Sequence, residues 1–167
     1  MNQAKEAIII VVDQIDYILS QIETEDYRRQ LPEFDGHSIG QHFRHILEFF
    51  QCLGNGMGEG VIDYASRERN MLYEDSPSIT ASAFRDFIQA LDKQDIDSAM
   101  KVKAEYGCDE RPDYHSSLSR ELLFVYDHAI HHLAIIRIGL TCHFSYVNMH
   151  RDLGVSPSTI KSRLMSS

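Results

Sequence analysis

The chain has 167 residues, 43% of them hydrophobic and 25% charged, which is ordinary for a globular protein and enough for a single domain spanning residues 1–167. Sixteen basic residues against 25 acidic ones give a formal charge of -9, which argues against a nucleic-acid partner. The three cysteines are widely spaced, and we find no signal or membrane-spanning segment. These features predict a cytoplasmic protein with reduced thiols and no membrane partner.

The first predicted element is a helix over residues 3–23. Its apolar residues repeat at alternating steps of four and three, as expected for a buried helical face: Ala4, Ile8, Val11, Ile15, Ile18 and Ile22. A second helix is predicted to begin after Ser38, where Gln41 completes a capping box. We expect it to end near Leu53, because a glycine-rich stretch over residues 54–60 follows and favours a flexible loop.

The second half of the chain predicts two more long helices. Thr80 is expected to cap the third, with Ile79 packing onto Phe84. The pattern weakens over residues 94–116, where alternation from Met100 to Tyr106 allows a short extended piece. A fourth long helix is predicted over residues 117–141, and a short C-terminal helix starts at Pro157. We therefore expect an all-α fold, a four-helix bundle with a long connection between helices.

Five of the nine histidines fall on two of these helices: His42, His45, His128, His131 and His132. A helix turns about 100° per residue, so His128 and His132 share one stripe, within the apolar arc. His42 and His45 likewise lie on the apolar side of their helix. A lone histidine there is usually a hydrogen-bonded core residue, but four on two facing stripes would each need a partner. A divalent metal would satisfy several at once, so the pattern favours a three-histidine site with an open position.

Two motifs resemble the DinB/YfiT-like superfamily of metal-binding four-helix bundles over roughly residues 1–141. They are Ser38 with His45 and Glu48, and the pair His128 and His132 late in the fourth helix. The resemblance implies that His45, His128 and His132 bind zinc or nickel. His42 and His131 are additional: His42 is an alternative ligand to His45, or both orient the ligands through hydrogen bonds.

The resemblance also implies a function, because some members of that superfamily are thiol-dependent transferases or isomerases. It predicts a metal-dependent thiol S-transferase, with a low-molecular-weight thiol such as bacillithiol or mycothiol and an electrophile as partners, and suggests a homodimer. Arg67 and Arg69 either contact an anionic thiol or belong to a solvated surface segment. Catalytic residues are unassigned; Glu48, Asp127 and Tyr17 are candidates for proton transfer. The alternative is a non-catalytic bundle with a structural or vestigial metal site, acting through protein contacts.

Overall fold

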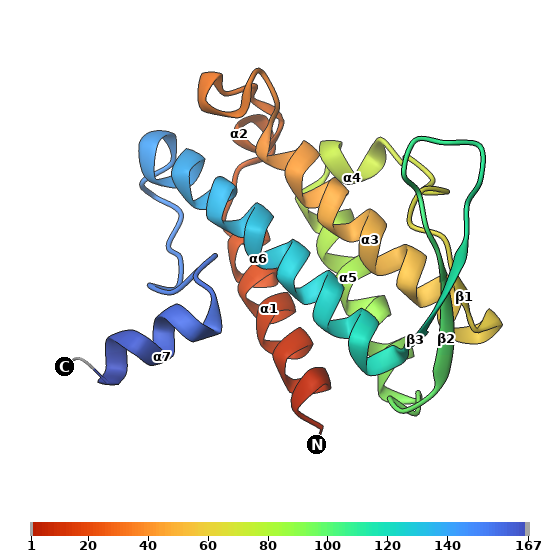
Figure 1. The fold of residues 1–167 in the computed structure, drawn as a ribbon. Coiled ribbons are helices and arrows are strands. Elements are labelled where there is room, and N and C mark those ends of the chain that lie inside the picture. The colour runs from red at the N-terminus through yellow and green to blue at the C-terminus, as the bar shows by residue number, and fades with distance from the viewer. Residues whose placement is uncertain (1, 166–167) are drawn as a thin grey trace.

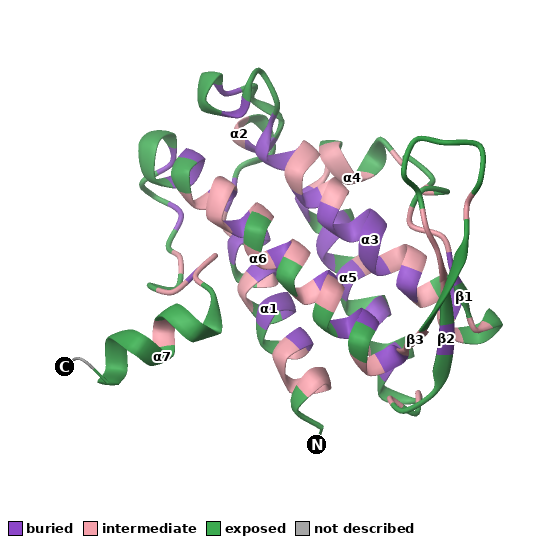
Figure 2. Cartoon of the chain, in the orientation of Figure 1, coloured by how far each residue is buried: buried purple, intermediate pink, exposed green. Residues whose placement is uncertain are grey.

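Four long helices enclose the core in the computed structural model, which describes residues 2–165 (Figure 1). They are α1 (Gln3–Leu19), α3 (Ile39–Glu59), α5 (Pro77–Asp92) and α6 (Leu118–His143). Each packs against two others, since α5 and α6 both contact α1 and α3. Buried residues between Ile8 and Leu153 form one hydrophobic cluster, and Figure 2 shows buried positions on the inner faces of these helices. The prediction of a mainly helical fold is confirmed.

A small sheet shows that the all-α prediction is wrong. It consists of β1 (Val61–Ile62), β2 (Ala99–Lys103) and β3 (Asp113–Ser117), in the order β1-β2-β3. The central strand β2 is parallel to β1 and antiparallel to β3. The extended piece near Met100 is therefore real, and the buried Met100 side chain anchors it to the core. The other two strands escaped prediction because β1 is only two residues long and β3 is polar (Asp-Tyr-His-Ser-Ser).

The second long helix begins where expected but ends later. Ser38 Oγ accepts a hydrogen bond from the Gln41 backbone N–H, and the Gln41 side chain accepts one from the Ser38 N–H, which forms the capping box. The predicted end near Leu53 is wrong, because α3 continues through the glycines to Glu59. A Cβ on Gly56 would lie 2.6 Å from Ile62 Cγ1, so the glycine allows β1 to pack closely on the helix.

The third long helix begins three residues before the predicted cap. Pro77 is its first residue, and the Ser76 side chain accepts a hydrogen bond from the Ile79 N–H. Thr80 instead lies inside the helix, fully buried, and donates its hydroxyl to the backbone carbonyls of Tyr73 and Ser76. The helix α5 therefore begins at the Ser-Pro pair, which is a sequence signal for a helix start, and not at Thr80.

The shorter helices are α2 (Thr24–Arg28), the 3-10 turn η1 (Pro32–Phe34), α4 (Leu72–Asp75) and α7 (Pro157–Met165). The predicted C-terminal helix is confirmed as α7, which has no buried residue and lies to one side of the bundle (Figures 1 and 2). Within residues 2–165, no helix has the length and apolar character needed to cross a bilayer.

The fourth long helix follows the sheet without a break. Ser117 is both the last residue of β3 and the N-cap of α6, and its side chain accepts a hydrogen bond from the Arg120 N–H. This start was predicted, and the helix extends two residues past the predicted end to His143. The continuity places the sheet at the N-terminal end of α6, with His128, His131 and His132 further along the same helix.

Candidate metal centre

Three imidazoles from two packed helices converge on one point. His45 lies on α3, whereas His128 and His132 lie one turn apart on α6. Their ring centroids are 5.0 Å (His45 to His128), 4.7 Å (His45 to His132) and 4.7 Å (His128 to His132) apart. One nitrogen from each ring lies within 4.8 Å of the other two. We call these three residues the histidine triad.

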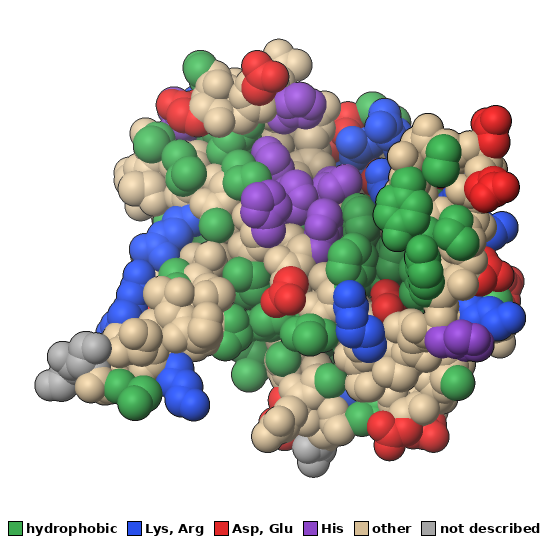
Figure 3. Space-filling view, in the orientation of Figure 1, with side chains coloured by type: hydrophobic (Ala, Val, Ile, Leu, Met, Phe, Trp, Pro, Cys, Tyr) green, Lys and Arg blue, Asp and Glu red, His purple; other side chains and the backbone are tan. Residues whose placement is uncertain are grey.

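The histidine triad is open to solvent on one side. Each member is half-buried, and the His45 side chain is 32% exposed. Figure 3 shows histidine side chains gathered at the surface of this face, with hydrophobic side chains beside them. A cavity of about 280 Å³ adjoins His45 and His132 and is also lined by His37, His42 and Arg69. A small molecule can therefore reach the point on which the imidazoles converge.

The surroundings keep the imidazoles of the triad uncharged at neutral pH. Burial lowers the pKa of His45 and of His128 to about 4, and that of His132 to about 3. Nearby positive groups add to this effect, Arg67 and Arg44 at His45 and the other histidines at His132. A neutral imidazole has a free lone pair on one nitrogen, which is the form that binds a metal.

His42 stands beside the triad rather than in it. Its Nδ1 lies 3.1 Å from His132 Nδ1, at hydrogen-bond distance. If His132 donates its Nδ1–H in this contact, its Nε2 keeps a free lone pair directed elsewhere. His131 is exposed, and its ring meets that of His132 edge-on at 5.2 Å. Of the two additional histidines, His42 therefore has the geometry to orient a ligand.

A buried ion-pair network lies behind His45. The Glu48 side chain is only 3% exposed, and its Oε2 is 3.9 Å from His45 Nδ1. Arg44 Nε lies 3.6 Å from Glu48 Oε1 and 3.1 Å from Glu74 Oε2. Burial raises the pKa of Glu48, while Arg44 and Arg67 act against that rise. Arg44 and Glu74 were not predicted from the sequence, although the i,i+4 spacing of Arg44 and Glu48 is a signal for Arg44.

The two predicted anion contacts differ in placement. Arg69 is exposed and lines the cavity beside the triad. Arg67 is engaged instead: its guanidinium lies 4.7 Å above the Phe49 ring, donates to the Tyr64 backbone carbonyl and has its Nε 3.7 Å from Glu48 Oε2. Arg69 is therefore the better placed of the two to meet an anionic ligand.

Of the three candidates for proton transfer, Glu48 is the one beside the triad. Glu48 adjoins His45, as described above. Asp127 is exposed on α6, and Tyr17 lines a different cavity together with Ile10 and Met149. Within residues 2–165, neither the Tyr17 nor the Asp127 side chain forms a hydrogen bond or an ion pair with the triad.

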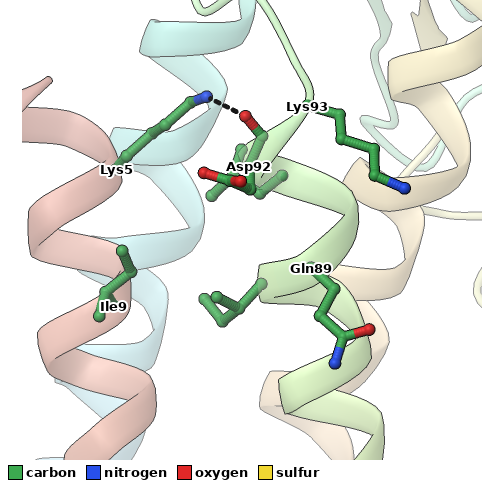
Figure 4. A pocket seen from close by; sticks show the side chains of 7 residues that line it. Lys5, Ile9, Gln89, Asp92 and Lys93 are labelled. Carbon is green, nitrogen blue, oxygen red and sulfur yellow. Dashed lines mark hydrogen bonds between the residues drawn. The ribbon is translucent and has the colours of Figure 1, made fainter. Parts of the chain in front are cut away.

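Another cavity, of about 440 Å³, lies between α1 and α5 (Figure 4). Two lysines, Lys5 and Lys93, line it, and Lys5 Nζ donates to the backbone carbonyls of Asp92 and Gln94 at 3.0 and 2.8 Å. Its walls include Ile9, Ile88 and Leu91 but no histidine. The imidazoles of the triad therefore lie at the α3–α6 face and not at this cavity.

Comparison with solved structures shows a similarity of fold. The crystal structure of a DinB-like protein, YjoA, from Bacillus subtilis aligns with a TM-score of 0.66 at 14% sequence identity, covering 93% of this chain and 100% of that one. No protein-family model and no curated protein matches the chain. At this level of identity the similarity concerns the fold. The chain has the DinB-like fold, which the motifs on its second and fourth long helices predicted.

Proposed function

We propose that this protein binds a divalent metal ion through His45, His128 and His132 and transfers a low-molecular-weight thiol to an electrophile. The convergence of one nitrogen from each imidazole, all within 4.8 Å of one another, is the observation that carries the proposal. Three imidazoles without a fourth protein ligand are typical of catalytic rather than structural zinc sites.

The donor set fits a borderline transition metal. Neutral imidazole suits zinc and nickel, whereas magnesium and calcium prefer oxygen ligands. The buried His128 Nε2 has no hydrogen-bond partner within residues 2–165, although an unpaired buried polar atom is costly. A metal ligand role accounts for that unpaired nitrogen and for three uncharged imidazoles at one point.

A bound divalent ion would supply a Lewis acid that lowers the pKa of a thiol at the open face. The protein's own groups would hold the thiol there. Arg69 and His37 line the adjoining cavity, and Arg69 offers a guanidinium to a carboxylate of the thiol. In the net reaction a carbon–sulfur bond forms, the leaving group departs with its electron pair, and the thiol proton passes to solvent through the cavity.

The test begins with the metal content of untagged protein purified without chelators, measured by elemental mass spectrometry. We expect about one zinc or nickel ion per chain. His45→Ala, His128→Ala and His132→Ala should lose the ion, whereas the exposed His131→Ala should keep it. Full occupancy in all three triad variants, or refusal of added metal by the unmodified chain, would refute the site.

Thiol binding is tested separately with cobalt-substituted protein. A thiol that coordinates cobalt adds a charge-transfer band to the visible and near-ultraviolet spectrum, and Arg69→Gln should weaken a thiol that carries a carboxylate more than a neutral one. A metal-loaded protein whose spectrum does not respond to any thiol would favour the non-catalytic alternative, in which the metal only stabilises the bundle.

A further inference from the structure

A further cavity, of about 270 Å³, lies between the sheet and the first turns of α6, outside the site described above. Its walls include Tyr64, Tyr114, Arg120, Glu121 and Phe124. Three of these five side chains are aromatic, and one carries a positive charge near the opening. The Arg120 side chain is 59% exposed, so its guanidinium is accessible.

A strip of aromatic rings connects this cavity to the histidine triad. Phe49 stacks on His128 at 3.9 Å between ring centroids, Tyr64 stacks on Phe49 at 5.4 Å, and Phe124 lies 4.9 Å from Tyr64. Phe124 is also 6.3 Å from His128, with the two rings inclined by 27°. We call Phe49, Tyr64 and Phe124 the aromatic strip. A flat molecule on the Phe124 ring would be one ring away from a triad imidazole.

A buried carboxylate fixes one end of the aromatic strip. Glu121 accepts a hydrogen bond from the Tyr64 hydroxyl at 2.9 Å and another from the Ser116 hydroxyl. The Glu121 side chain is 6% exposed, so this network is part of the protein interior. Its effect is to hold the Tyr64 ring in one orientation, which makes the wall of the cavity rigid.

Two guanidinium groups stand beside the aromatic strip. Arg67 lies 4.7 Å from the centre of the Phe49 ring, and Arg120 lies 5.9 Å from that of Phe124. Arg67 is occupied by Glu48 and the Tyr64 carbonyl, whereas the ion pair between Arg120 and Glu121 is long, at 3.9 Å. Since the two oxygens of Glu121 already accept hydrogen bonds from Tyr64 and Ser116, Arg120 is the cation available to a ligand at this end.

We propose that this cavity binds the planar aromatic ring of an electrophile that carries a carboxylate. The rings of Tyr64 and Phe124 would form the stacking surface, and Arg120 would hold the carboxylate of the electrophile. This inference names the electrophile class of the proposed thiol transfer and rests on that function. For an arylmethyl halide carboxylate, the thiol sulfur forms a bond to the benzylic carbon, the carbon–halogen bond breaks, and halide leaves with the electron pair. The thiol proton goes to solvent.

The binding step is tested on metal-free protein with 2-naphthoate as the probe. Titration of ¹⁵N-labelled protein, followed by amide chemical shifts, should move signals of β3 and the first half of α6. Phe124→Leu and Arg120→Gln should each raise the Kd about fivefold, the first by loss of stacking and the second by loss of an ion pair. Arg85→Gln is the matched control, because Arg85 is 54% exposed and pairs with Asp16 at the α1–α5 side.

The ligand chemistry is tested with two analogues. Cyclohexanecarboxylate lacks the flat ring and 2-naphthylmethanol lacks the charge, so both should bind more weakly than 2-naphthoate. Four outcomes would each overturn the proposal. Two concern affinity: equal Kd values for all three compounds, or an unchanged Kd in Phe124→Leu and Arg120→Gln. Two concern the chemical shifts: changes confined to the α1–α5 cavity, or no change with millimolar probe. Arg120→Gln keeps the test decisive if Phe124→Leu does not fold.

The two proposals fail separately. His132→Ala should abolish metal binding and leave the naphthoate Kd unchanged, since His132 does not line this cavity. Metal binding without naphthoate binding would overturn the proposed electrophile cavity and leave the proposed metal site. Naphthoate binding in a chain that refuses metal would overturn the proposed transfer and leave the pocket. With loaded protein and a thiol, Arg120→Gln should raise KM for 4-(chloromethyl)benzoate but not for neutral benzyl chloride.

Discussion

Removing the imidazole of His42 should weaken metal binding although His42 is outside the triad. Binding through His132 Nε2 requires the proton of that ring to sit on Nδ1, and His42 Nδ1 is 3.1 Å away to accept it. In His42→Ala, the His132 Nδ1–H loses this acceptor in a partly buried position, and the ring is free to adopt the other tautomer or to rotate.

The size of the effect follows from the lost hydrogen bond. An unsatisfied buried donor costs about 1–3 kcal/mol, and about 1.4 kcal/mol corresponds to a factor of ten in an equilibrium constant. We therefore expect the Kd for zinc to rise roughly 10- to 100-fold, which is also the usual effect of removing a hydrogen-bond partner of a metal ligand. Competition with a chromophoric chelator at pH 7 measures this shift.

His131→Ala is the matched control, because His131 is exposed and its ring meets the same His132 ring edge-on. Its Kd should stay within a factor of two or three of the unmodified chain, as is usual for surface changes. His42→Gln, which retains an acceptor, should recover part of the affinity. If His42→Ala and His131→Ala weaken zinc equally, or neither does, His42 does not position His132.

Three further predictions concern stability. The pKa values of the triad histidines, about 4 and 3, lie below the usual value near 6.5, so the unfolded chain binds more protons than the folded chain between these pH values. The metal-free protein should therefore lose stability as the pH falls from about 6.5 to 4. Urea unfolding in EDTA at pH 7 and pH 5 measures this loss, and equal midpoints would contradict it. Gly56→Ala should lower the free energy of unfolding by about 1–3 kcal/mol, because the new Cβ would lie 2.6 Å from Ile62 Cγ1. Gly58→Ala should raise it by about 0.5–1 kcal/mol, because a Cβ there meets open space. The unfolding midpoints of the two variants must shift in opposite directions. Ser76→Ala removes the N-cap of α5 and should lower the free energy of unfolding by about 0.5 kcal/mol. This is a small effect for an N-cap, because the hydrogen bond from the Ile79 N–H to Ser76 Oγ is long, at 3.4 Å. An unchanged unfolding midpoint would show that Pro77 alone sets the start of α5.

The features that were predictable from sequence are those decided within one helix. The capping box of Ser38 and Gln41 needs only residues three apart, and it was confirmed. The spacing of His128 and His132 fixes both on one stripe of α6 whatever that helix packs against. In contrast, His42 and His45 both fall on the apolar side of α3, so only the packing of α3 on α6 decides which one meets the pair.

The features that were missed depend on contacts between distant segments. The end of α3 could not be read from its glycines, because the strand that packs on Gly56 is itself too short to predict. The Arg44–Glu74 ion pair joins α3 to α4, and the hydrogen bond from Tyr64 to Glu121 spans 57 residues. No local periodicity reports such contacts, so the groups around the triad became visible only with the fold.

The triad separates two unlike surfaces, and this arrangement suits a reaction between two different molecules. On the side of His132 and His45 the adjoining cavity carries Arg69 and His37, which favour a polar, anionic ligand. On the side of His128 the neighbours are Phe49 and, one ring further, Phe124, which favour a flat apolar one. A thiol and an aromatic electrophile held on these two sides would meet at the triad without competing for one surface.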